Sequence, residues 1–168
     1  MHIQAKASVL ERVDVSILMM SIAFFIPLIF TSPQWIIGII INLLLFLAAD
    51  KFDTKKQIPI IVLPSIAALL HGTLFGVFSL FLMYLMPFIW LGNAILVRTM
   101  VYSKLSYLYR MVLASVLKVL VLFITSYILV SLDIIPKIFL TAMGLMQLVT
   151  ALAGGLLASI ILNKKHAE

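Results

Sequence analysis

The chain has 168 residues, of which 64% are hydrophobic and only 11% are charged, and its mean hydropathy is +1.25. An ordinary soluble domain carries about 25% charged residues to cover its surface, so this composition excludes a water-soluble globular protein. The net charge of +6 does not indicate a nucleic-acid partner, because the basic residues lie where membrane topology needs them. In lipid every backbone N–H and C=O must be paired internally, and continuous rather than alternating apolar runs predict helices instead of a β-barrel.

Taken in chain order, the apolar runs predict an all-α membrane protein with six transmembrane helices in a single domain, residues 1–168. The first run ends at Pro33, and the second ends at the polar stretch 50–57. Gly72 and Gly76 mark the turn between the third and fourth runs. The expected spans are residues 15–31, 34–49, 58–75, 77–97, 105–131 and 136–162.

The distribution of basic residues predicts that the N- and C-termini are both cytoplasmic. With six spans, the two termini and the second and fourth loops face the same side, and these segments hold 10 of the 12 lysines and arginines. Lys137 falls on the other side, and Lys118 lies within a span. Five or seven spans would place a basic cluster on the outer side, so the charge pattern supports six.

Polar residues inside the spans are candidates for function, because burying them in lipid is costly. Lys118 is the most informative, since all six acidic residues lie at span ends, in cytoplasmic segments or in terminal segments. One hypothesis is that Lys118 meets an anionic group of a substrate. The favoured alternative is a structural lysine that faces carbonyls and amides, loses its proton or extends toward the inner surface.

Other polar side chains leave similar alternatives open. His71 could contact a ligand, although a hydrogen-bonded histidine at a helix end is favoured. Asn42 is expected to join helices by hydrogen bonds, whereas Asn93 and Gln147 suit that role and substrate contact equally. Asn93 follows Trp90 in a segment broken by a proline, where freed carbonyls could line a cavity.

Small residues recur every four positions in the sixth span, a spacing that lets another helix approach closely. One such stripe consists of Ala151, Gly155 and Ser159. The broad face that it helps to form is a candidate surface for a partner protein, and Ser21 in the first span is a further candidate.

The sequence gives no support for an enzyme. It contains no Walker-type glycine loop, no HExxH motif and no paired carboxylates, and it has no cysteine. No metal site and no intrinsic cofactor are therefore expected, and any ATP hydrolysis is expected to reside on partner subunits.

Three stretches carry a family resemblance: residues 63–76, which begin Leu63-Pro64-Ser65 and end in "HGTLFG", "MPFIWLGN" at 86–93, and "GLMQLVTALAGGLLASIIL" at 144–162. Together with six spans joined by short loops and an excess of basic residues, these stretches make the chain resemble the substrate-binding S components of energy-coupling factor (ECF) transporters. The resemblance implies a multi-pass protein of a prokaryotic inner or plasma membrane. Such a protein captures a micronutrient, vitamin-like or haem-like, from outside. The implied partners are membrane lipids, a T-type transmembrane subunit and two cytoplasmic ATPases.

The resemblance also implies where the small-molecule substrate binds. The family pocket lies in the outer half of the membrane, which by depth favours His71, Lys118 and Gln147, with Trp90 and Asn93 deeper. In the family an Ala-xxx-Ala pattern in the first span commonly contacts the T component. This sequence departs from that pattern, since its first span has serines and one suitably placed alanine but no alanine pair at that spacing.

Two other functions remain open from sequence alone. An autonomous secondary transporter or channel usually relies on buried carboxylates for ion coupling, and none lies at mid-membrane depth here. A membrane scaffold protein of envelope assembly would use Lys118 only structurally, so that replacing it with methionine would leave function intact.

Overall fold

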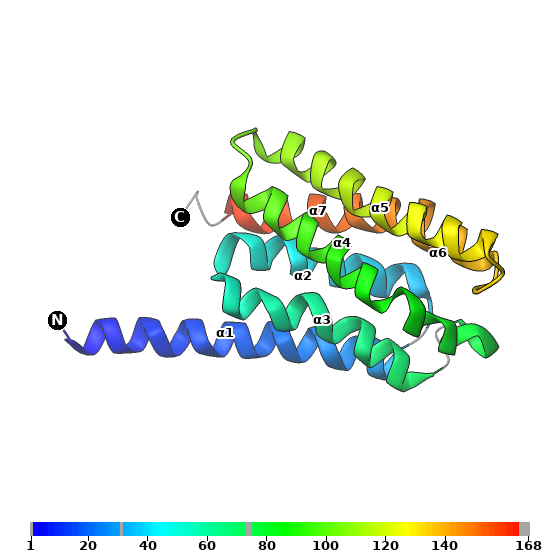
Figure 1. The fold of residues 1–168 in the computed structure, drawn as a ribbon. Coiled ribbons are helices and arrows are strands. Elements are labelled where there is room, and N and C mark those ends of the chain that lie inside the picture. Colours follow the sequence, from blue (N-terminus) through cyan, green and yellow to red (C-terminus); the bar gives the residue numbers. More distant parts are fainter. Residues whose placement is uncertain (1, 31, 73–74, 165–168) are drawn as a thin grey trace.

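The computed structural model describes residues 2–30, 32–72 and 75–164, and in these ranges it is helical with no strand (Figure 1). Its elements are α1 (His2–Ile29), α2 (Gln34–Lys51), α3 (Thr54–His71), the 3-10 helix η1 (Gly76–Phe81), α4 (Leu82–Tyr102), α5 (Tyr107–Ser131), α6 (Ile138–Met143) and α7 (Leu145–Lys164). Helix η1 runs directly into α4, and only Gly144 separates α6 from α7.

Among the described residues, four helical segments are long and apolar enough to cross a membrane. They are Gln34–Lys51, Gly76–Tyr102, Tyr107–Ser131 and Ile138–Asn163, and Val15–Ile29 is a shorter apolar segment. Helix α3 lies in the same bundle but is less apolar, because it begins with Thr-Lys-Lys-Gln and contains two prolines. The all-α, multi-pass membrane class is thus confirmed, whereas six crossings and cytoplasmic termini stay predictions.

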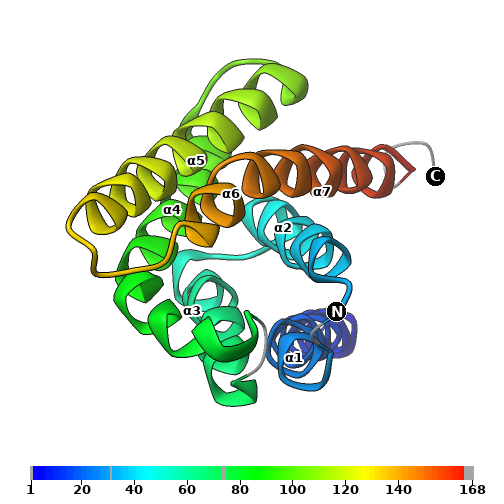
Figure 2. The ribbon, with the colours of Figure 1, turned by 90° about the vertical axis from the view of Figure 1, so that its right-hand side faces the viewer.

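The helices form a ring when the bundle is viewed end-on, in the order α1, α3, α4, α5, α7 and α2 (Figure 2). The most extensive packing joins α2 to α7, α4 to α5 and α1 to α3, while α2 also contacts α4 across the ring. Helix α1 packs only lightly against α2. The ring is therefore closed most weakly between these two helices.

Basic residues gather at one end of the bundle. The beginning of α1, the end of α7 and the turns α2–α3 and α4–α5 all lie there (Figure 1). We call this the basic end, and the basic residues there whose side chains the structure describes are Lys51, Lys55, Lys56, Arg98, Lys104 and Arg110. Lys137 lies at the opposite end, in the connection between α5 and α6.

The turn between α2 and α3 shows how short loops close this bundle. The Asp53 side chain accepts a hydrogen bond from the Lys56 amide at 3.2 Å, which caps the first turn of α3. The Gln57 side chain donates to the carbonyls of Phe52, at 2.7 Å, and Ala48, at 3.3 Å. The Ala48 carbonyl and the Lys56 amide also have backbone partners, so these side-chain bonds reinforce the turn that joins α2 to α3.

A tyrosine joins α5 to α7 near the basic end. The Tyr107 hydroxyl donates to the carbonyl of Gly155 at 2.8 Å. We expect Tyr107→Phe to lower the free energy of unfolding by about 1 kcal/mol, since one hydrogen bond of a partly buried group is lost. SDS-induced unfolding in mixed micelles measures this loss, and Tyr109→Phe is the matched control because Tyr109 is 72% exposed. Equal stabilities of the two variants would contradict the expectation.

Candidate functional site

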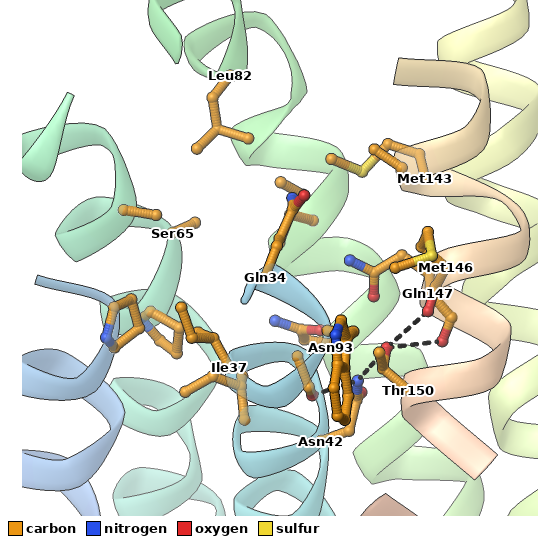
Figure 3. A pocket seen from close by; sticks show the side chains of 18 of the residues that line it. Gln34, Ile37, Asn42, Ser65, Leu82, Asn93, Met143, Met146, Gln147 and Thr150 are labelled. Carbon is orange, nitrogen blue, oxygen red and sulfur yellow. Dashed lines mark hydrogen bonds between the residues drawn. The ribbon is translucent and has the colours of Figure 1, made fainter. Parts of the chain in front are cut away.

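A cavity of about 120 Å³ lies among the helices, in the half of the bundle away from the basic end (Figure 3). It is lined by the end of α1, the start of α2, the second half of α3, the first half of α4, the middle of α5, and α6 with the start of α7. Besides Lys118, its polar lining residues are Gln34, Asn42, Ser65, Asn93, Gln147 and Thr150.

Lys118 belongs to a hydrogen-bonded cluster at this cavity. It lies near the middle of α5, is 3% exposed, and donates from Nζ to Oδ1 of Asn42 on α2 at 2.7 Å. Asn42 Nδ2 donates to Oγ1 of Thr150 on α7 at 3.2 Å and to the Gly38 carbonyl at 2.9 Å. Thr150 Oγ1 lies 2.9 Å from the Met146 carbonyl, to which it donates (Figure 3). We call Lys118, Asn42 and Thr150 the lysine cluster.

The orientation of the Asn42 amide follows from its partners. The Gly38 carbonyl can only accept, so the amide nitrogen must face it and the amide oxygen is left for Lys118. Each member of the lysine cluster thus donates to the next, and the lysine receives the acceptor that suits it. One acceptor satisfies only one of the three N–H donors of an ammonium group.

No carboxylate takes part in this arrangement within the described part of the chain. Asp50 and Asp53 lie at the basic end, and Asp133 follows α5 at the other end. A buried cation without an opposite charge is costly. Lys118 therefore has only uncharged polar neighbours in this arrangement.

Two glycines provide room for the lysine cluster. A Cβ on Gly92 of α4 would lie 3.3 Å from Cγ of Lys118, so the lysine stem packs directly on this glycine. A Cβ on Gly38 of α2 would lie 3.0 Å from Cγ2 of Thr150. Larger residues at either place would press on the side chains that carry the polar contacts.

A second set of polar contacts joins α3 to α4 at the cavity. Asn93 Nδ2 donates to the Ile61 carbonyl at 3.0 Å, and Trp90 Nε1 donates to Ser65 Oγ at 2.7 Å. The Ser65 hydroxyl itself donates to the Val62 carbonyl at 3.0 Å. These bonds fix the two helices against each other where Ser65 and Asn93 line the cavity.

The structure brings together three of the predicted substrate-binding residues, since Asn93, Lys118 and Gln147 line one cavity. Trp90 reaches it only through Ser65. His71 ends α3 and is not among the described lining residues. These three residues lie on three different helices, α4, α5 and α7, and the fold brings them together at the cavity.

Some lining residues were not singled out from sequence as candidates for substrate contact. Asn42 was expected only to join helices, yet it holds Lys118 and also lines the cavity. Thr150 sits among the small residues of α7, and Gln34 stands at the start of α2. A polar residue within or beside an apolar run was the available signal for Asn42 and Gln34.

The small-residue face of α7 is covered by the chain itself. Ala151 and Gly155 are buried, and a Cβ on Gly155 would meet Met111 of α5 and Phe46 of α2. This inward orientation leaves Ala151 and Gly155 unavailable to an outside protein. Ser159 is half-buried and its hydroxyl donates to the Leu156 carbonyl at 2.7 Å, and Ser21 is half-buried on α1.

No family model, curated protein or solved structure matches the chain. In the described ranges, no group of three or more histidine or acidic side chains is placed to hold a metal ion. The lining of the cavity provides one amine, several amides and hydroxyls, and apolar walls.

Proposed function

We propose that this chain is the substrate-binding membrane subunit of an ATP-driven micronutrient importer. The observation that carries the proposal is the lysine cluster, which lies at a cavity lined by residues from every α-helix of the bundle. A buried amine that faces only amide and hydroxyl groups suits an anionic or amphiphilic guest. A cavity of about 120 Å³ favours a small vitamin-like molecule over haem.

The place of the cavity supports capture from outside. It lies in the half of the bundle away from the basic end. Under the positive-inside rule the basic end faces the cytoplasm, so the cavity belongs to the outer half of the membrane. Release on the inner side then requires a change of position or shape, and we assign the energy for it to a T-type transmembrane subunit and two cytoplasmic ATPases.

Co-purification tests the importer assignment. A tagged chain extracted in mild detergent should recover a second polytopic membrane protein and ATPases, and the reconstituted complex should take up substrate only with ATP. Lys118→Met should abolish uptake, whereas Lys104→Met at the exposed basic end should not. Uptake by the purified chain alone in liposomes would instead show an autonomous transporter.

Cysteine labelling tests the orientation. The chain has no cysteine, so a single introduced thiol is the only label site. In intact cells, Lys137→Cys should react with a membrane-impermeant maleimide, and Lys104→Cys should react only after the membrane is opened. Both side chains are exposed and lie in connections between helices, so the protein itself leaves both thiols open to the reagent. The reverse pattern would place the cavity on the cytoplasmic side.

A further inference from the structure

Asn93 leaves a buried acceptor at the cavity without a donor. The side chain is 3% exposed, and its Oδ1 has no hydrogen-bond partner among the described residues. Its Nδ2 faces the Ile61 carbonyl, which can only accept, so the amide cannot be turned to exchange the two atoms. A buried polar atom without a partner is costly, and Asn93 is one of the residues that line the cavity, so a donor on a bound molecule would supply the missing partner.

The acceptor and the amine belong to facing helices. Gly92, the residue before Asn93 on α4, packs on the stem of Lys118 on α5, where a Cβ would lie 3.3 Å from Cγ. Asn93 and Lys118 also line the same cavity. A molecule bound in this cavity therefore lies beside both residues. Ile37, Met143 and Met146 supply apolar surface around them.

We propose that the cavity recognises a small monoanion that carries an O–H or N–H donor close to its anionic group. The anionic group accepts from Nζ of Lys118, and the donor bonds to Oδ1 of Asn93. This inference rests on the proposed function, for which it names the class of substrate. The lysine provides charge recognition, and the asparagine separates such molecules from anions of the same shape that lack the donor.

Two ligand pairs test this with the purified full-length chain in detergent. Pyrrole-2-carboxylate and furan-2-carboxylate have nearly the same shape, but a ring N–H in the first is an oxygen in the second. Lactate and propionate also differ by one donor, because only lactate carries a hydroxyl group beside its carboxylate. Isothermal titration calorimetry should show the donor-bearing member of at least one pair binding about tenfold more tightly, the value of one good hydrogen bond. The neutral pyrrole-2-carboxamide should bind more weakly than pyrrole-2-carboxylate.

Variants assign the effect to the two residues. Asn93→Leu should equalise the affinities within the preferred pair, and Lys118→Met should weaken both members at least about tenfold. Tyr109→Phe, remote from the cavity, should bind like the unchanged chain. The ligand comparison on the unchanged chain does not depend on whether any variant folds.

Equal affinity within both pairs, tighter binding of the donor-free members, no binding of any of the four anions, or a preference that survives Asn93→Leu would each overturn the inference. Its failure is distinguishable from failure of the proposed function. If ATPases are recovered but the chain shows no donor preference, only the inferred substrate class is wrong. If the chain shows the donor preference but no ATPases are recovered, the binding site stands and the importer proposal is wrong.

Discussion

Replacing Asn42 with leucine is expected to lower the free energy of unfolding by about 3 kcal/mol, the largest loss from any polar side chain at the cavity. Asn42 gives Lys118 its acceptor at 2.7 Å and bonds to Thr150 and the Gly38 carbonyl. Leucine has a similar size but leaves the buried amine without its partner. SDS-induced unfolding in mixed micelles measures the change, and Asn163→Leu at the exposed end of α7 is the matched control.

A second substitution shows whether the loss comes from the unpaired amine. In the double variant Asn42→Leu, Lys118→Met, no buried amine remains to be satisfied. We expect this variant to recover about 2 kcal/mol relative to Asn42→Leu, because replacing both partners by apolar groups costs less than removing one. A double variant less stable than Asn42→Leu alone would show that the two residues contribute independently.

Replacing Gly154 with alanine is expected to cost about 3 kcal/mol, because the new methyl group would meet backbone rather than a mobile side chain. Its Cβ would lie 2.7 Å from the Leu43 nitrogen and 2.8 Å from the Ile39 carbonyl oxygen, so α7 would have to move away from α2. That movement would also lengthen the hydrogen bond from Asn42 Nδ2 to Thr150 Oγ1, which is 3.2 Å long.

The neighbouring glycine provides the control for Gly154. A Cβ on Gly155 would come within 2.5 Å of Met111 Cγ, but methionine is flexible and can turn aside. Gly155→Ala should therefore cost about 1 kcal/mol, clearly less than Gly154→Ala. Both variants are compared in the same unfolding assay. Equal losses would mean that close backbone approach is not what holds α2 to α7.

Hydropathy located the apolar runs well but not the ends of every helix. The first run was expected at 15–31, whereas α1 covers His2–Ile29, since a helix can continue past the part that lipid favours. The last run was expected as one helix, yet it divides at Gly144. A Cβ there would lie 2.7 Å from the Leu140 carbonyl oxygen and 2.9 Å from Phe123 of α5, so glycine suits both the local backbone and the neighbouring helix.

The sequence identifies individual polar residues that line the cavity, but it does not show that they lie together. A polar residue inside an apolar run identifies Lys118, Asn93 and Gln147 one at a time. The bond between Lys118 and Asn42 joins positions 76 residues apart, and depth in a membrane does not tell which way each helix is turned. The same limit applies to the small-residue face of α7, where periodicity defines the face but not its neighbour.

The light packing between α1 and α2 gives the cavity one movable wall. Pro27 near the end of α1 lines the cavity, but α1 is held chiefly by α3. Tilting α1 outward about α3 therefore separates the most lightly packed pair of neighbouring helices in the ring. The lysine cluster lies on α2, α5 and α7, so a displacement of α1 alone would leave its hydrogen bonds in place.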